Sequence, residues 1–139
     1  MTEFTLDKRL DEDTVLIGDF GLCQLRLMND VRWPWLVLVP RLAGASEIHD
    51  LNETDQSLLA HETALVAAAL KRLTGCGKIN SAAIGNIVRQ LHVHVIARSA
   101  GDANWPGPVW GFETRRQYQQ GEMTVMIDTI RRELSANFL

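Results

Sequence analysis

The chain has 139 residues, of which 46% are hydrophobic and 22% are charged, and its net charge is −3 at pH 7. A chain of this length fits one domain whose core needs no metal or disulfide. The slight excess of acidic residues excludes the broad basic surface typical of a nucleic-acid-binding protein. We predict a single domain over residues 1–139, with its core in about residues 4–100 and a C-terminal tryptophan- and proline-containing segment and helix in residues 101–139.

Nothing in the sequence predicts secretion or membrane insertion. Charged residues are frequent between Asp7 and Asp13, where a signal peptide would need an apolar core. The longest apolar runs are far too short to span a bilayer. We therefore expect a cytoplasmic protein that binds neither membranes nor nucleic acids.

Three strands are predicted in the first third of the chain. The β-branched run Thr14–Ile17 and the alternating segment Leu22–Met28 are separated by a turn that contains two glycines, which is typical of a hairpin. The continuous apolar run Trp35–Val39 ends at Pro40, which indicates a more deeply buried strand.

The rest of the chain alternates between helices and strands. Apolar residues recur at helical spacing over Glu53–Leu73, with Asn52 as a good N-cap. Two strands, Lys78–Ile84 and Ile87–Ala97, follow, and then an amphipathic helix over about Glu122–Ala136. This order predicts an α+β domain: an antiparallel sheet of about five strands, one long helix between strands and one C-terminal helix.

The segment Gln90–Ile96 carries the residues that point to chemistry. Alternate residues of a strand share one face, about 6.5–7 Å apart, so Gln90, His92 and His94 are predicted to point the same way, while the apolar residues between them face a core. Two neighbouring imidazoles are costly to bury without partners. An anion, a metal ion or a shared proton would explain the pair.

Spacing alone leaves three interpretations of His92 and His94. They are two satisfied structural histidines, or ligands of a metal, or the centre of phosphate chemistry, in which a neutral imidazole is the nucleophile and its neighbour is a cation or proton donor. A zinc site would need further ligands, and none of the other candidates stands at ligand spacing: His49, His61, Cys23 and Cys76.

The stretch Gly85–Arg98 resembles the signature of the histidine triad (HIT) family, a Gly-Gln or Gly-Asn turn followed by His-φ-His-φ-His-φ-φ, where φ is apolar. Pro34–Pro40 resembles the family's strand Pro-x-His-x-Leu-Val-x-Pro, and Lys78–Asn80 resembles the strand that supplies a phosphate-binding asparagine. The resemblance covers roughly residues 22–98. The segment Trp105–Gly111 resembles the tail of a proteobacterial HIT branch with the same Gln-x-His-x-His variant of the triad.

The resemblance implies an enzyme that acts on nucleotides without a cofactor or a metal. It would be a phosphohydrolase or nucleotidyl transferase acting on the α-phosphate of a purine nucleotide, such as a dinucleoside polyphosphate or a nucleoside phosphoramidate. His92, at the middle position, would form a nucleotidyl-histidine intermediate, and His94 would contact the phosphate and the leaving group. HIT proteins of this size resemble dimers, so we expect a homodimer, with the tryptophan-containing tail close to the active site or to the partner.

The resemblance also implies which residues hold the nucleotide. The anion cradle would consist of Asn80, Gly85, Asn86 and Ile87. Asp30 would bind the ribose, and Met28 would pack against the base. Three of these residues also have a purely structural alternative. Asn80 and Asp30 could be turn residues, and Met28 could be an ordinary core residue.

Three positions depart from the family pattern. Gln90 replaces the first histidine of the triad, Trp35 replaces the histidine of the earlier strand, and Ile87 stands where many members carry Ser or Thr. Glutamine donates and accepts hydrogen bonds but does not titrate near pH 7. The alternatives to an enzyme are therefore a catalytically weak nucleotide-binding module and a metal-binding protein that uses His92 and His94.

Overall fold

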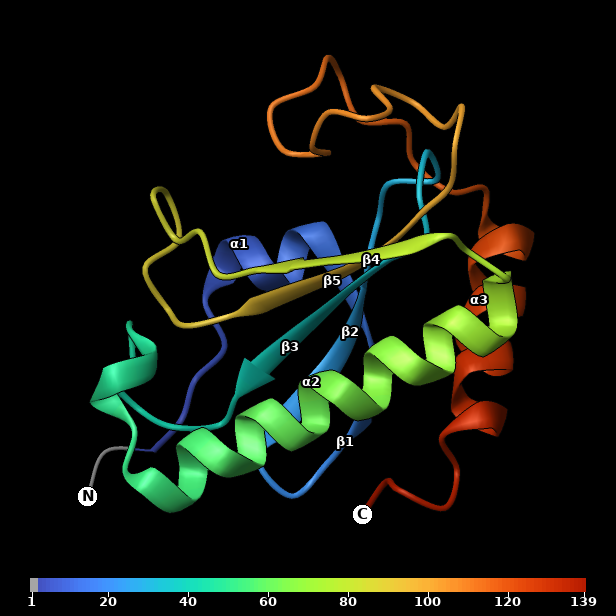
Figure 1. Cartoon of the computed structure of the whole chain (residues 1–139). Helices are drawn as coiled ribbons and strands as arrows, with labels where there is room; N and C mark the ends of the chain where they lie inside the picture. Colours follow the sequence, from blue (N-terminus) through green and yellow to red (C-terminus); the bar gives the residue numbers. More distant parts are fainter. Residues whose placement is uncertain (1–2) are drawn as a thin grey trace.

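The computed structural model describes residues 3–139 as a five-stranded sheet with helices packed around it (Figure 1). Residues 1 and 2, the start of the predicted domain, lie outside the described residues. The helices are α1 (Lys8–Asp13), the short 3-10 helix η1 (Ile48–Asp50), α2 (Glu53–Thr74) and α3 (Gln120–Glu133). The strands are β1 (Thr14–Asp19), β2 (Cys23–Met28), β3 (Trp35–Pro40), β4 (Lys78–Ala82) and β5 (Val93–Arg98).

The strand order in the sheet is β1-β2-β3-β5-β4, and every neighbouring pair is antiparallel. β1 and β2 form the predicted hairpin. Helix α2 carries the chain from β3 to the edge strand β4, and β5 then returns between these two strands. The predicted α+β fold, with one long helix between strands and one C-terminal helix, is confirmed. β5 is an inner strand whose backbone pairs on both sides.

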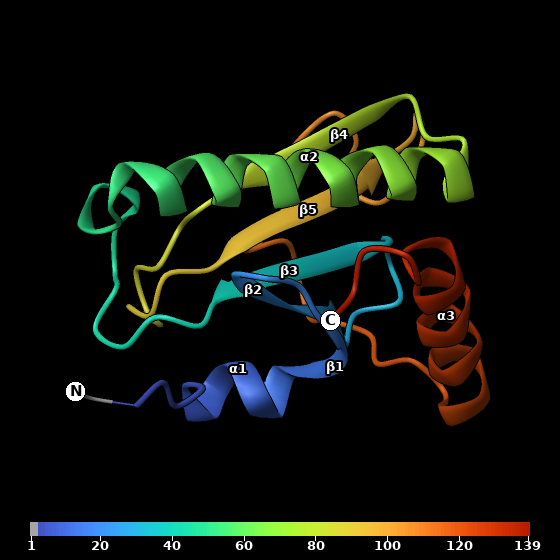
Figure 2. The same ribbon diagram turned by 90° about the horizontal axis from the view of Figure 1, so that it is seen from below.

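Helix α2 begins and ends on strong local signals. The Asn52 side chain accepts a hydrogen bond from the backbone N–H of Asp55, and Gly75 adopts the left-handed conformation that ends the helix. Between these ends, one face of the helix is apolar and lies along the sheet (Figure 2). Its buried apolar side chains are Leu59, Val66, Ala69 and Leu70.

The two faces of the sheet have separate cores. On one face, the strands pack with α2 and with α3, which lies at the right in Figure 1. On the other face, β3 and β5 pack with α1 and with the segment 99–119, which follows β5. The buried apolar side chains of this second core are Leu10, Trp33, Trp35, Val37, Val39, Ile96 and Val109. The candidate site lies beside this second core.

The largest difference from the predicted elements lies before β5. The predicted strand Ile87–Ala97 begins only at Val93, so the preceding residues form a loop. Gly85 in this loop has a φ of 73°, a left-handed conformation that favours glycine. The Leu91 N–H donates to a carbonyl oxygen in the loop before η1 rather than to a neighbouring strand. The alternation expected at Gln90 therefore does not occur. No sequence pattern predicts the short helices α1 and η1.

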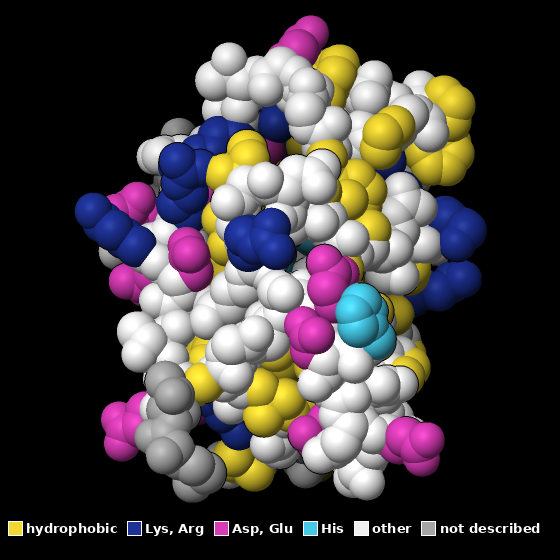
Figure 3. Space-filling view, turned by 90° about the vertical axis from the view of Figure 1, so that its left-hand side faces the viewer, with side chains coloured by type: hydrophobic (Ala, Val, Ile, Leu, Met, Phe, Trp, Pro, Cys, Tyr) yellow, Lys and Arg dark blue, Asp and Glu magenta, His cyan; other side chains and the backbone are white. Residues whose placement is uncertain are grey.

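Within residues 3–139, no helix has both the length and the hydrophobicity needed to cross a membrane. On the face shown in Figure 3, Lys and Arg side chains are interspersed with Asp and Glu side chains. The described part of this face thus carries charges of both signs.

Candidate active site

A cavity of about 520 Å³ lies on the second face of the sheet, and both histidines of the Gln-x-His-x-His segment line it. Its walls come from the loop before β5, the ends of β2 and β3, helix α1 and residues 109–115. Of the predicted site residues, those that line it are Met28, Asp30, Gly85, Asn86, Ile87, His92 and His94. Asn80 and Gln90 are not among its lining residues.

His92 stands just before β5, and its side chain is almost completely buried. Its ring Nδ1 lies 2.7 Å from the backbone carbonyl oxygen of Gln90. Because a carbonyl oxygen only accepts hydrogen bonds, Nδ1 carries the ring proton. The other ring nitrogen, Nε2, then keeps its lone pair, which is what a nucleophile needs.

His94 is the second residue of β5, and its ring centroid lies 5.0 Å from that of His92. The indole N–H of Trp35, on β3, donates to His94 Nδ1 over 2.9 Å. Burial and, to a lesser extent, the charge of His92 lower the pKa of His94 to about 3. His94 is therefore neutral near pH 7 and carries its proton on Nε2.

Trp110 completes an aromatic enclosure around His94. Its ring centroid lies 5.5 Å from that of His94 and 6.4 Å from that of Trp35, both in edge-to-face geometry. Its Nε1 is buried without a hydrogen-bond partner among the described residues. Through Trp110, the tryptophan-containing tail thus forms one wall of the cavity.

Gln90 contributes to the site through its main chain. Its side-chain carbonyl accepts from the backbone N–H of Asp7 at 2.8 Å, and its side-chain N–H donates to the carbonyl oxygen of Thr5 at 2.9 Å. The side chain therefore holds the N-terminal segment, while the backbone oxygen binds His92. The prediction that Gln90 shares a strand face with both histidines is wrong, because β5 begins three residues later.

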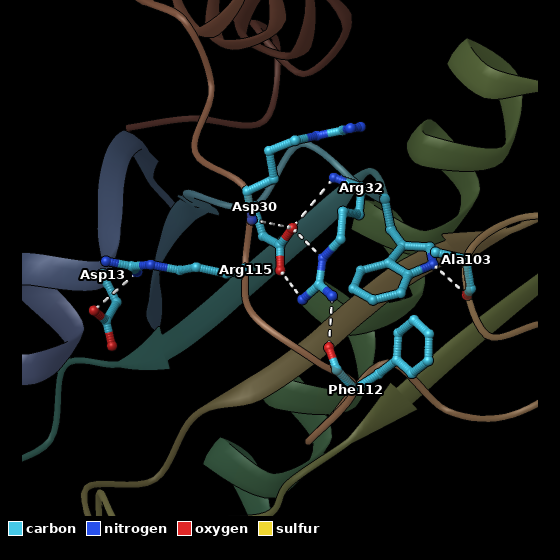
Figure 4. A network of polar contacts seen from close by, with 8 residues as sticks. Asp13, Asp30, Arg32, Ala103, Phe112 and Arg115 are labelled. Carbon is cyan, nitrogen blue, oxygen red and sulfur yellow. Dashed lines mark hydrogen bonds and ion pairs between the residues drawn. The ribbon is translucent and has the colours of Figure 1, made fainter.

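Asp30 and Arg32 form an ion pair in the wall of the cavity (Figure 4). The Arg32 guanidinium donates to both carboxylate oxygens, through Nε at 2.9 Å and through Nη2 at 2.8 Å. Burial opposes ionisation, but the hydrogen bonds and charge of Arg32 outweigh it and lower the pKa of Asp30. Arg32 also donates to the carbonyl oxygen of Phe112. A ribose contact at Asp30 would share a carboxylate that Arg32 already binds.

Asn80, on β4, is hydrogen-bonded to another side chain of the protein. In the register of β4 and β5, Ala82 rather than Asn80 pairs with His94. The Asn80 Oδ1 accepts a hydrogen bond from Nη1 of Arg98 at 3.2 Å. Arg98 is only 1% exposed and also forms an ion pair with Asp102. Asn80 is thus part of the network that holds the loop after β5, and its role in phosphate binding stays a prediction.

Several cavity side chains are not indicated by the sequence patterns. Arg115 forms an ion pair with Asp13 over 3.0 Å, and both line the cavity (Figure 4). In the sequence, Trp35 stands out only as a departure from the family pattern, yet its indole contacts His94 directly. The aromatic and arginine residues gathered in the segment 105–116 are the sequence signal for this part of the cavity wall.

The metal-binding interpretation of His92 and His94 needs at least one further ligand. Within the described part of the chain, no three His, Cys, Asp or Glu side chains come close enough together to hold a metal ion. One nitrogen of each imidazole is already bound by a protein partner. Among the described residues, the histidine pair therefore lacks the third ligand that a metal site would need.

An antiparallel α+β domain with a His-x-His pair at the start of an inner strand, facing a largely apolar cavity, defines a site of the histidine triad class. Residues 9–101 match the HIT domain family. The chain belongs to this family, and the resemblance seen in the Gly85–Arg98 segment is confirmed.

Known structures agree with this assignment over nearly the whole chain. A histidine triad protein of Sinorhizobium meliloti is 56% identical, with a TM-score of 0.92 over 94% of this chain and 97% of that one. One from Marinobacter aquaeolei is 39% identical, with a TM-score of 0.95 over 98% and 99%. A Sulfolobus tokodaii protein described as a hypothetical histidine triad nucleotide-binding protein shares the fold, at 16% identity and a TM-score of 0.68 over 88% and 85%. No match is found among curated proteins.

Proposed function

We propose that this chain binds a purine nucleotide in the cavity and attacks its α-phosphate with Nε2 of His92. The observation that carries the proposal is the 2.7 Å contact between His92 Nδ1 and the Gln90 carbonyl oxygen, which directs the ring lone pair to Nε2. A neutral imidazole is nucleophilic near pH 7. The Sulfolobus tokodaii protein with the same fold is described as nucleotide-binding, which supports the class of ligand.

The proposed reaction has two steps at phosphorus. In the first, the Nε2 lone pair of His92 forms a bond to the α-phosphorus, the bond to the leaving group breaks, and the electron pair departs with that group. In the second, water or another acceptor attacks phosphorus, and the N–P bond returns its electron pair to Nε2. The proton of the attacking water passes to solvent. Splitting one transfer into two is the usual benefit of covalent catalysis.

The loop before β5 is the proposed anion cradle. Gly85, Asn86 and Ile87 line the cavity beside both histidines. The left-handed Gly85 turns the backbone there, and a Cβ would lie 3.3 Å from the backbone oxygen of Val88. Backbone N–H groups of such a loop stabilise the charge that develops on a phosphoryl group. Met28, the last residue of β2, also lines the cavity and is the proposed contact for the base.

Turnover tests the proposal directly. The full chain is incubated with diadenosine polyphosphates and with adenosine phosphoramidates, beside a His92→Ala variant. A matched control is His49→Ala, since His49 is exposed and does not line the cavity. We expect turnover by the wild type and by His49→Ala only. Turnover that persists in His92→Ala, or no turnover by the wild type, would overturn the proposed reaction.

A second candidate function is nucleotide binding with little catalysis. It is favoured by Gln90 and Trp35, which do not titrate near pH 7 and which stand where the family pattern has histidines. Calorimetry with AMP distinguishes the two functions. Binding of AMP without turnover of any tested substrate would favour the binding module, and failure to bind any nucleotide would exclude both.

The homodimer expected from the family resemblance is also a proposal. Trp33 and Trp35 are buried inside the chain, so their side chains are not available for a dimer interface. The backbone of β5 is paired on both sides and cannot pair with a strand of a second copy. Trp105, which is 40% exposed, and the edge strand β4 are available. Sedimentation velocity over a concentration series tests the dimer, and a monomer at every concentration would refute it.

A further inference from the structure

Trp35 stands where the family pattern has a histidine, and its indole is bound directly to the site. In the register of β3 and β5, Val37 pairs with His94 and Trp35 pairs with Ile96, one step further along the same face. The Trp35 Nε1 lies 2.9 Å from His94 Nδ1, and both side chains are buried. The ring centroids are 5.6 Å apart.

The direction of this hydrogen bond fixes the protonation of His94. An indole nitrogen only donates, so Nδ1 of His94 must accept, and the single ring proton lies on Nε2. An imidazolium carries protons on both nitrogens, so forming one would leave the Trp35 N–H pointing at another N–H. The hydrogen bond therefore opposes a second proton on His94.

The groups around His94 reinforce this preference. Burial and the neighbouring charge of His92 both lower the pKa of His94, to about 3. The Trp110 ring, on the other side, is uncharged. The charged residues of the cavity wall include two ion pairs, Asp30 with Arg32 and Asp13 with Arg115. The remaining carboxylate, Glu113, is an exposed residue of the cavity wall.

We propose that Trp35 is a positioning residue that holds His94 as a neutral imidazole with its proton on Nε2, so that His94 gives the substrate a hydrogen bond and gives the leaving group no proton. A neutral imidazole that lost its Nε2 proton would become an imidazolate, which is far too basic to form near pH 7. The site is therefore suited to leaving groups that depart without a proton. This inference rests on the proposed function, in which His92 is the nucleophile.

The chemistry separates two classes of substrate. With a dinucleoside polyphosphate, the His92 Nε2–P bond forms, the P–O bond to the bridging oxygen breaks, and the electron pair leaves on a terminal phosphate oxygen, which is stable as an anion. With an alkyl phosphoramidate, the P–N bond breaks, and the amine nitrogen needs a proton as it departs. His94 does not supply that proton. The chain is thus expected to prefer polyphosphates over alkyl phosphoramidates.

Nuclear magnetic resonance tests the protonation state without any turnover. Long-range ¹H–¹⁵N correlation spectra of the full-length labelled chain report which ring nitrogen carries the proton, and a His94→Gln variant assigns the signals. Between pH 5 and 8 we expect His94 to show one protonated nitrogen, Nε2, and no titration. Titration of His94 in this range, or a proton on Nδ1, would overturn the proposal.

Variants at Trp35 test the cause. Trp35→Phe keeps an aromatic ring and removes the donor, so His94 should show both tautomers and a raised pKa. Trp35→His restores an N–H donor and should restore the Nε2 proton. Trp105→Phe is the matched control, because Trp105 is not among the residues that line the cavity, and it should leave the signals unchanged. An unchanged His94 spectrum in folded Trp35→Phe would overturn the role of Trp35.

Kinetics test the leaving-group preference. We expect the wild type to cleave a diadenosine polyphosphate at least about tenfold faster than an alkyl phosphoramidate of AMP, and Trp35→Phe to narrow that ratio. A wild-type preference for the phosphoramidate would overturn the inference. Absence of turnover with both substrates would overturn the proposed function together with this preference, while the resonance titration would still decide the protonation of His94.

Discussion

The Asp30 carboxylate and the Arg32 guanidinium, two residues apart, meet through two hydrogen bonds of 2.9 and 2.8 Å in the wall of the cavity. Because Arg32 also donates to the Phe112 carbonyl oxygen, the pair fastens the segment after β5 to the end of β2. Removal of the buried Asp30 leaves a guanidinium without its partner. Asp30→Asn should therefore lower the free energy of unfolding at pH 7 by about 3 kcal/mol. Urea unfolding measures this, with the exposed Asp128→Asn as control.

The same ion pair makes stability depend on acid. The folded-state pKa of Asp30 lies below its ordinary value of about 3.9. Its contribution is therefore complete above the ordinary pKa and is lost as the pH falls through the folded pKa. The stability difference between wild type and Asp30→Asn should be constant above about pH 5 and shrink below that. A difference that grew as the pH fell would contradict the assigned direction of the pKa shift.

Gln90 is expected to support stability more than chemistry. Gln90→Ala removes the two side-chain hydrogen bonds to Thr5 and Asp7 but keeps the carbonyl oxygen that binds His92. We expect a loss of about 1–3 kcal/mol in the free energy of unfolding, with kcat changed less than about threefold. Thermal unfolding and steady-state kinetics check the two parts. A large fall in kcat without loss of stability would show that the side chain acts in catalysis.

Arg98 is expected to be the strongest polar contributor to the loop after β5. It is 1% exposed and binds Asp102, Asn80 and the backbone of that loop. Arg98→Met should cost about 3–5 kcal/mol, because it leaves the carboxylate of Asp102 without its partner. Arg98→Lys should rescue little, since an ammonium cannot form the same bidentate contact. Denaturant unfolding compares both with the exposed Arg9→Met, and full rescue by lysine would refute the account.

Gly18 is required by the packing of the C-terminus. A Cβ at this position would lie 2.8 Å from the ring of Phe138, which stacks on Phe20 with centroids 4.8 Å apart. Gly18→Ala should therefore cost about 1–3 kcal/mol through overpacking. A double-mutant cycle with Phe138→Ala checks the cause. If the clash is responsible, the alanine costs less in the Phe138→Ala background, whereas an equal cost would point to the backbone instead.

Much of the fold follows from local signals in the sequence. The hairpin of β1 and β2, the buried strand β3 and the capped helix α2 each have their own period or end signal, and each lies within two residues of its predicted bounds. The start of β5 has no such local signal, because apolar residues continue through the loop before it. The backbone there is set by the left-handed Gly85 and by a hydrogen bond from Leu91 to a distant loop, which no local pattern encodes.

The candidate site likewise contains residues that local sequence patterns predict and residues that they do not. His92 and His94 are recognisable because their spacing is short and their motif is specific, and both line the cavity. Their partners are harder to predict, since Trp35 lies 59 residues from His94 in sequence and meets it only through strand pairing. For Asn80 and Asp30, residue type alone suggests ligands. Tertiary contacts with Arg98 and Arg32 give each of them a structural role in this state.

The central claim is that His92 carries the nucleotidyl group, and the intermediate itself is the most direct test. The chain is mixed with a diadenosine polyphosphate, quenched in alkaline denaturant within one turnover, and examined by intact-protein and peptide mass spectrometry. We expect one nucleotidyl group on the peptide that contains His92, present in wild type and His49→Ala and absent from His92→Ala. Turnover with His92 unmodified, or with the group on another residue, would contradict it.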